Sequence, residues 1–277
     1  MLTAKDIRGV CVMMPTPTIE GGGDWRVENS VDLEEAARFT ETFIRDGVGS
    51  FAVCGTTGEC ASLLWEEKAA FVDTIVQVNS GRIPIFAGAT SLGTKETIRQ
   101  MRALKEIGAD GAFVGLPLWQ TPTAENSVQW FADLSEAVPD MPIMVYSNSM
   151  FFKSVFPTEF WEAVAKAAPT VITNKIASPT IQENLEAIVE VTNGRISFLP
   201  LQANAANARE RVGDKIQGLW STAAAMGPEP VVALWAAIER GDKERLAAIQ
   251  EDMKAVPPAM PPEKRGEDFP KYNSQLN

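Results

Sequence analysis

The sequence predicts a single (β/α)8 TIM barrel with an additional C-terminal helix, and three observations support this α/β fold. Short apolar runs of strand length alternate eight times with amphipathic stretches of helix length, which is typical of repeated βα units around a parallel sheet. The chain has 277 residues, 45% of them hydrophobic, which suits one domain of barrel size. No G-x-G-x-x-G motif follows the first apolar run, which disfavours a dinucleotide-binding sheet.

Each βα unit can be assigned in chain order. The expected strands are Val10–Pro15, Gly49–Val53, Ile83–Ala87, Gly111–Val114, Ile143–Tyr146, Val171–Lys175, Ile196–Leu199 and Ile216–Trp220. The expected helices lie near residues 32–46, 65–79, 94–107, 123–137, 158–167, 179–191, 203–212 and 228–240. We expect the barrel and its C-terminal helices to occupy residues 1–254, and the proline-rich segment 255–277 to form an extended arm.

Composition excludes several classes of function. The net charge is −11 and no cluster of Lys and Arg is present, so nucleic acid is not an expected partner. The three cysteines lack CxxC spacing, no apolar run is long enough to cross a membrane, and the N-terminus lacks an apolar signal core, so we expect a cytoplasmic protein. The chain contains no histidine, which removes the commonest proton shuttle and zinc ligand; we expect no metal site.

Lys175 is the first candidate for catalysis because it closes the apolar run that begins at Val171. A lysine at the C-terminal end of a buried strand is desolvated, which favours its neutral and nucleophilic amine. Its sequence neighbours Asn174 and Ile176 carry no charge that would stabilise the ammonium. This placement suits a Schiff-base enzyme, although an edge-strand lysine facing solvent fits the same pattern.

Two further motifs follow other strands of the predicted barrel. The turn from Gly55 to Glu59 places the hydroxyls of Thr56 and Thr57 between glycines, where they and backbone N–H groups can converge on a carboxylate. Glu59 itself is expected to be a structural hydrogen-bond acceptor. Tyr146 ends the fifth strand and, without histidine, is the best candidate for proton transfer beside Lys175, unless it is an ordinary core tyrosine.

Together these motifs resemble the class I aldolase family of dihydrodipicolinate synthase and N-acetylneuraminate lyase, and the resemblance extends from Pro15 to about Met253. It implies a homotetrameric barrel that binds a pyruvoyl group as an imine on Lys175 without any cofactor. By the same resemblance, Gly55, Thr56 and Thr57 hold the pyruvoyl carboxylate and Tyr146 relays protons.

Departures from the general family indicate a branch with apolar anchors. Pro117-Leu118-Trp119 stands where dihydrodipicolinate synthase has paired tyrosines, and Met150-Phe151-Phe152 replaces an arginine that holds a second carboxylate. The chain is similar to the hydratase-aldolases of polycyclic aromatic hydrocarbon breakdown. The stretches that carry this similarity are Met14-Pro15-Thr16-Pro17, Asp24-Trp25-Arg26, Gly58-Glu59-Cys60-Ala61, Leu219-Trp220-Ser221 and Lys271-Tyr272-Asn273.

The similarity implies an arylidene pyruvate substrate that is hydrated and then cleaved to an aryl aldehyde and pyruvate. Trp119, Phe152 and Trp220 are expected to form a slot for the aromatic ring, although ordinary core packing explains any one of them at least as well. The polar candidates for contact with water or a ring substituent are Asn148, Gln202 and Asn273.

The ring substituent is the least determined part of the expected function. No acid lies between Arg195 and Glu210, whereas Gln202, Asn204 and Asn207 offer amide donors, which favours trans-2'-carboxybenzalpyruvate, an intermediate of phenanthrene degradation. The alternatives are trans-o-hydroxybenzylidenepyruvate of naphthalene degradation, another pyruvate aldolase reaction of the same superfamily, and, in a different class, a protein that binds a 2-oxo acid without turning it over.

Overall fold

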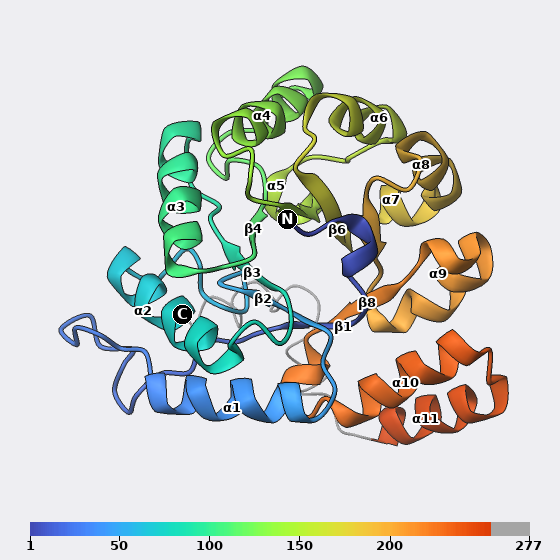
Figure 1. Cartoon of the computed structure of the whole chain (residues 1–277), viewed down its shortest axis with the longest axis horizontal. Coiled ribbons are helices and arrows are strands. Elements are labelled where there is room, and N and C mark those ends of the chain that lie inside the picture. Colours follow the sequence, from blue (N-terminus) through green and yellow to red (C-terminus); the bar gives the residue numbers. More distant parts are fainter. Residues whose placement is uncertain (256–277) are drawn as a thin grey trace.

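The computed structural model describes residues 1–255, which form a barrel of eight parallel strands surrounded by helices (Figure 1). The strands follow the order β7-β6-β5-β4-β3-β2-β1-β8. The circle closes between β7 and β8 through the Leu201–Trp220 bridge, where Trp220 N–H donates to the Pro200 carbonyl at 2.8 Å. The predicted fold class is therefore confirmed.

All eight predicted strands are present, with ends that shift by a few residues. Their bounds are β1 (Gly9–Met13), β2 (Ser50–Val53), β3 (Ile85–Gly88), β4 (Gly111–Val114), β5 (Ile143–Asn148), β6 (Val171–Ala177), β7 (Ser197–Leu199) and β8 (Gly218–Ser221). The strands β5 and β6 run two residues beyond their predicted ends because their ladder continues through the pairs Ser147–Ile176 and Asn148–Ala177. Both strand ends that carry catalytic candidates are thus held by a neighbouring strand.

The helices cover the outside of the barrel. Their bounds are α1 (Leu33–Arg45), α2 (Trp65–Asn79), α3 (Thr94–Ile107), α4 (Ala124–Ala137), α5 (Ser149–Phe152), α6 (Thr158–Ala167), α7 (Pro179–Glu183), α8 (Leu185–Thr192), α9 (Ala205–Val212), α10 (Glu229–Arg240) and α11 (Lys243–Ala255). The stretch predicted as one helix over 179–191 is two helices, because the backbone of Asn184 leaves helical geometry at φ −104° and ψ 21°. The short helix α5 was not predicted.

The apolar core fills the barrel and the layer between strands and helices. Every residue of β2, β3 and β4 is buried, as expected for parallel strands with covered faces. Large side chains such as Phe51, Phe86 and Phe113 fill this core. Within residues 1–255, none of the helices has the length and apolar character needed to cross a bilayer. The predicted C-terminal arm, apart from Ala255 at the end of α11, lies outside the described residues, so it stays a prediction.

Candidate active site

Lys175 and Tyr146 stand side by side at the C-terminal end of the barrel, where enzymes of this fold carry their active sites. Their Cα atoms are partners in the parallel register of β5 and β6. Lys175 is 5% exposed, and its Nζ lies 4.1 Å from the centroid of the Tyr146 ring and 3.9 Å from that of Trp220. The amine therefore points into the barrel and not toward bulk solvent.

Burial is the main influence on the Lys175 amine. Removal from water disfavours the ammonium and lowers the pKa of Lys175 from 10.5 to about 7, while the neighbouring Cys11 acts weakly in the opposite direction. Among residues 1–255, no carboxylate forms an ion pair with this lysine. About half of the amines are consequently neutral at pH 7 and able to attack a carbonyl.

The hydroxyl of Tyr146 joins two of the other predicted residues. It shares a hydrogen bond of 3.2 Å with the Thr56 hydroxyl, and the Asn148 side-chain amide donates to it at 3.5 Å. The Asn148 carbonyl oxygen also accepts from the backbone N–H of Met150 and Phe151, which fixes this side chain as the N-cap of α5. Burial raises the pKa of Tyr146, so its phenol keeps its proton at neutral pH and can donate it.

The turn from Gly55 to Glu59 takes a constrained path over β2. Cys54 and Glu59 adopt left-handed backbone conformations, with φ of 50° and 55°, although neither is glycine. A Cβ on Gly58 would lie 2.7 Å from the Cys54 nitrogen and 2.9 Å from the Met14 carbonyl oxygen, so only glycine fits. The turn presents Thr56 to Tyr146, while the side chain of Thr57 is exposed.

Glu59 does not take the structural role expected of it. Its carboxylate forms no hydrogen bond within the described chain, and burial together with Glu67 raises its pKa. The structural acceptor is Glu67, which receives hydrogen bonds from Ser30 and from the backbone N–H of Leu64. Glu67 lies at the third position of α2 and closes the start of that helix.

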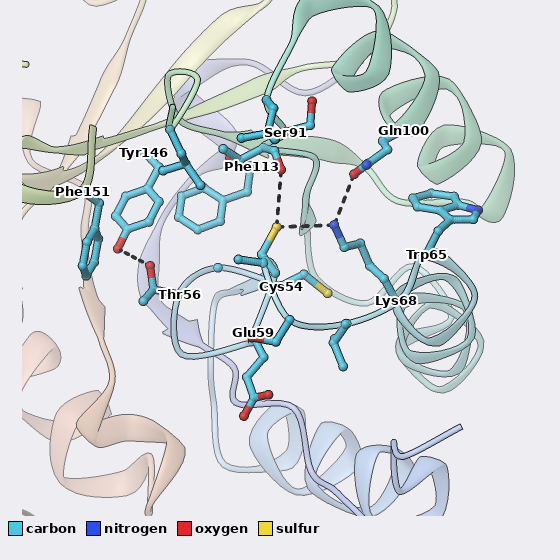
Figure 2. Close-up of a pocket in the computed structure, with 18 of the residues that line it drawn as sticks. Cys54, Thr56, Glu59, Trp65, Lys68, Ser91, Gln100, Phe113, Tyr146 and Phe151 are labelled. Atoms are coloured by element: carbon cyan, nitrogen blue, oxygen red, sulfur yellow. Dashed lines mark hydrogen bonds between the residues drawn. The ribbon is translucent and has the colours of Figure 1, made fainter. Parts of the chain in front are cut away.

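A cavity of about 460 Å³ opens beside Tyr146 (Figure 2). Gly55, Thr56, Tyr146 and Phe152 line it, but Lys175 does not. The Tyr146 ring contacts both the cavity and the Lys175 amine, so it lies between them. The further apolar and polar residues around this cavity include Leu63, Trp65, Thr90, Ser91, Leu118 and Phe151.

Of the three aromatic residues predicted to form a ring slot, only Phe152 and Trp220 contact the catalytic candidates: Phe152 contacts Tyr146, and Trp220 contacts Lys175. Phe152 is buried and packs edge-on against the Tyr146 ring at a centroid distance of 5.2 Å. A Cβ on Gly115 would come within 1.9 Å of the Phe152 ring, so this glycine makes room for it. Trp119 is 76% exposed and does not line the cavity. The three side chains thus form no common slot within one chain.

Gln202 is held beside the closure of the barrel. Its side-chain oxygen accepts from the hydroxyl of Ser221, which follows Trp220 on β8. Within residues 1–255 the Gln202 amide nitrogen has no hydrogen-bond partner, whereas that of Asn204 donates to Gln182. Asn273 lies outside the described residues, so its predicted role remains a prediction.

Two residues that contact the site were not predicted from the sequence. Phe113 on β4 stacks on Tyr146 at a centroid distance of 4.8 Å, a contact between strands that periodicity alone does not reveal. Lys68 on α2 is 3% exposed, lines the cavity, and donates to the Gln100 side chain and the Cys60 sulfur (Figure 2). Its position in a helix with acids in the first turn resembles that of an ordinary surface lysine.

A buried polar pair fixes the strands behind the catalytic residues. The Asn174 amide donates to the Val145 carbonyl at 3.0 Å and to the Ser147 hydroxyl at 2.8 Å, and this hydroxyl lies 3.0 Å from the Lys175 carbonyl. Because side chains alternate along a strand, Ser147 and Asn174 face outward where Tyr146 and Lys175 face inward. We call Ser147 and Asn174 the strand clamp.

The site therefore combines an amine that is about half neutral at pH 7, a protonated phenol and an apolar surrounding, which together suit formation of an imine with a 2-oxo acid. The thiols of Cys11 and Cys54 are buried, and burial raises the pKa of each to about 12, so neither acts as a nucleophile at neutral pH.

Comparison with known proteins identifies the family. The profile of the Dihydrodipicolinate synthetase family matches residues 9–263. The trans-O-hydroxybenzylidenepyruvate hydratase-aldolase of Pseudomonas putida is 37% identical over 279 residues, covering 99% of this chain and 83% of the relative. The trans-2'-carboxybenzalpyruvate hydratase-aldolase of Nocardioides sp. (strain KP7) is 34% identical over 272 residues, covering 98% and 81%.

The solved structure of PhdJ bound to a substrate intermediate superposes with a TM-score of 0.93 at 35% identity, covering 99% of this chain and 85% of that one. These similarities extend over the whole barrel and include the elements that carry Lys175, Tyr146 and Thr56. The chain belongs to the dihydrodipicolinate synthetase family, as a carbon–carbon lyase similar to its hydratase-aldolases.

Proposed function

We propose that this enzyme hydrates a trans-arylidene pyruvate and then cleaves it by a retro-aldol reaction to an aryl aldehyde and pyruvate, through a Schiff base on Lys175. The observation that carries the proposal is the buried Lys175 amine, with a pKa of about 7, beside the Tyr146 phenol. The hydratase-aldolase names of relatives at 34% to 37% identity support the substrate class.

The proposed reaction uses one covalent link for both steps. The Lys175 amine attacks C2 of the 2-oxo acid and the carbonyl oxygen leaves as water, which gives an iminium conjugated to the alkene. Water then adds across the alkene: its oxygen bonds to the distal carbon, C4, and C3 takes up a proton, which restores the iminium. In the retro-aldol step, the C4 hydroxyl loses its proton, and the electron pair of the C3–C4 bond moves toward the iminium. The aryl aldehyde leaves and an enamine remains, which is protonated at C3 and hydrolysed to pyruvate.

Tyr146 has the geometry to transfer these protons, since its hydroxyl both accepts from Asn148 and bonds to Thr56. We propose that Thr56 and the backbone of Gly55 bind the substrate carboxylate, as the glycine-flanked turn allows. Thr57 is exposed and is the weaker candidate for this contact. No metal or organic cofactor is required for this sequence of steps.

For the ring substituent we propose an ortho-carboxylate. The support is Gln202, whose side-chain oxygen is engaged by Ser221, so that its two amide N–H donors remain for an anionic group. An ortho-hydroxyl substrate is the second candidate, because relatives named for that substrate are 37% identical while the relative named for the carboxyl compound is 34% identical.

Two measurements test the proposal. Borohydride reduction with pyruvate, followed by intact mass and peptide mapping, should give an adduct on Lys175 that Lys175→Ala abolishes; an unmodified wild-type chain contradicts imine chemistry. Comparison of kcat/KM for the ortho-carboxy and ortho-hydroxy substrates then decides the substituent. A higher value for the hydroxy compound overturns the carboxylate assignment.

A further inference from the structure

The Lys175 amine is flanked by two aromatic rings from different strands. Its Nζ lies 3.9 Å from the Trp220 centroid and 4.1 Å from the Tyr146 centroid, well within the range in which a cation is attracted to a ring face. Trp220 stands on β8, yet its indole N–H donates to the Ile176 carbonyl at 2.7 Å. This hydrogen bond anchors the indole to β6, one residue beyond Lys175.

The environment that favours a neutral amine creates a difficulty for the next step. An iminium carries a positive charge, and burial disfavours it for the same reason that it disfavours the ammonium. Within residues 1–255 no carboxylate pairs with Nζ, and the thiol of Cys11, with its pKa raised to about 12, is uncharged at neutral pH. Compensation of the iminium charge must come from another source.

We infer that Tyr146 and Trp220 form an aromatic cage that stabilises the iminium on Lys175, with Trp220 as a catalytic residue. The inference rests on the proposed Schiff-base function and goes beyond it. Ring faces carry negative electrostatic potential without a titratable charge, so they attract a buried cation without holding the amine permanently protonated as a carboxylate would. Trp220, expected from the sequence to contact the substrate ring, instead contacts the reacting nitrogen.

The charge balance of the imine reaction determines how the cage is detected. When the free amine is neutral, forming the iminium creates a new positive charge and takes up a proton, so the cage favours adduct formation. When the free amine is already an ammonium, one cation replaces another and the contribution of the cage largely cancels. The cage therefore affects the apparent affinity for pyruvate above pH 7 and has little effect well below it.

The test replaces Trp220 by mono-, di-, tri- and tetrafluorotryptophan through nonsense suppression. Fluorine withdraws electron density from the ring face while the indole keeps nearly the same shape and its N–H donor to Ile176, so no cavity is created. The fraction of chains in the imine form is read by intact mass after a rapid borohydride quench over a range of pyruvate concentrations. We expect the apparent Kd to rise stepwise with fluorine content, by about tenfold in total at pH 8.5 and less than twofold at pH 5.5.

The same fluorotryptophan series at Trp25, which is 85% exposed, is the matched control and should leave the apparent Kd unchanged. If the unsubstituted enzyme forms the Lys175 adduct but the series at position 220 is flat at pH 8.5, the cage is wrong and the proposed function stands. A rise of equal size at both pH values also overturns the cage, because it indicates a structural effect. If the unsubstituted enzyme forms no adduct, the proposed function fails and the cage fails with it.

Discussion

Tyr146 and Lys175 are direct partners across β5 and β6, and this register is what brings the phenol ring within 4.1 Å of the amine. A slip of one residue between the two strands would move one of the side chains to the outer face of the barrel. The distance between the Tyr146 ring and the Lys175 amine therefore depends on the pairing of β5 with β6. The hydrogen bonds of the strand clamp, Ser147 and Asn174, stabilise this pairing on the outer face of the barrel.

Replacing Asn174 by Ala should destabilise the protein by about 2 to 3 kcal/mol, because it leaves the buried Val145 carbonyl without its side-chain donor and removes one of the two hydrogen-bond partners of the Ser147 hydroxyl. Urea unfolding measures this. Ser197→Ala is the matched control, since the buried Ser197 hydroxyl has no hydrogen-bond partner among the described residues and its loss should be neutral or stabilising. Equal losses for both variants would contradict the role of the clamp.

The rate of imine formation with pyruvate should depend on pH with a midpoint near 7. The pKa of Lys175 is lowered to about 7, so the reactive neutral amine predominates above that value, and its concentration falls tenfold for each pH unit well below it. Burial raises the pKa of Tyr146, so its phenol should stay protonated through pH 9. Stopped-flow or quench trapping between pH 5 and 9 gives the midpoint, and a midpoint above 9 would show that the amine is solvated.

Tyr146→Phe should lower kcat about 10²- to 10³-fold while pyruvate still forms an adduct on Lys175, because the ring remains and only the proton-transferring hydroxyl is lost. Steady-state kinetics and borohydride trapping on the same preparation separate the two effects. Phe152→Leu is a packing control, since it loosens the edge contact with Tyr146 but keeps the hydroxyl. Turnover of the Tyr146 variant within threefold of the wild type would exclude the phenol as the proton carrier.

Lys175→Met should make the fold more stable at neutral pH. The folded-state pKa of about 7 lies below the ordinary 10.5, so burying this lysine costs free energy, in full below pH 7 and not at all above 10.5. The lowering of the pKa from 10.5 to about 7 corresponds to about 5 kcal/mol of unfolding free energy at most, since each unit of pKa shift is worth about 1.36 kcal/mol. Urea unfolding at pH 6.5 and 9 should show a larger advantage of the variant at pH 6.5, and no advantage at either pH would contradict the buried-lysine interpretation.

The positions of the strands were predictable because each is a short run of apolar residues. Such a run can be recognised in the sequence without knowing which strand it pairs with. Their ends were less predictable. The extension of β5 to Asn148 depends on hydrogen bonds to β6, and the break at Asn184 depends on local backbone geometry. Neither leaves a mark in hydrophobic periodicity.

The residues of the candidate site also fall into a group that could be predicted from the sequence and a group that could not. Lys175, Tyr146 and Thr56 could be chosen as candidates from the sequence because active-site residues of a barrel lie at the C-terminal ends of its strands and in the loops after them. Phe113 and Lys68 were not, because their contacts join segments that are distant in the sequence. Trp119 was predicted to contact the substrate ring from its place after a strand, but its side chain is exposed in the single chain.

The three cysteines differ in burial, so the accessibility of one native thiol can report on the cavity. Cys11 and Cys54 are shielded thiols whose raised pKa keeps them unreactive toward maleimides, whereas Cys60 is partly exposed at the wall of the cavity beside Lys68. A single labelling reagent therefore modifies one position in the folded barrel. Protection of that position by added 2-oxo acids offers a direct way to follow occupancy of the cavity, without engineering a new probe into the chain.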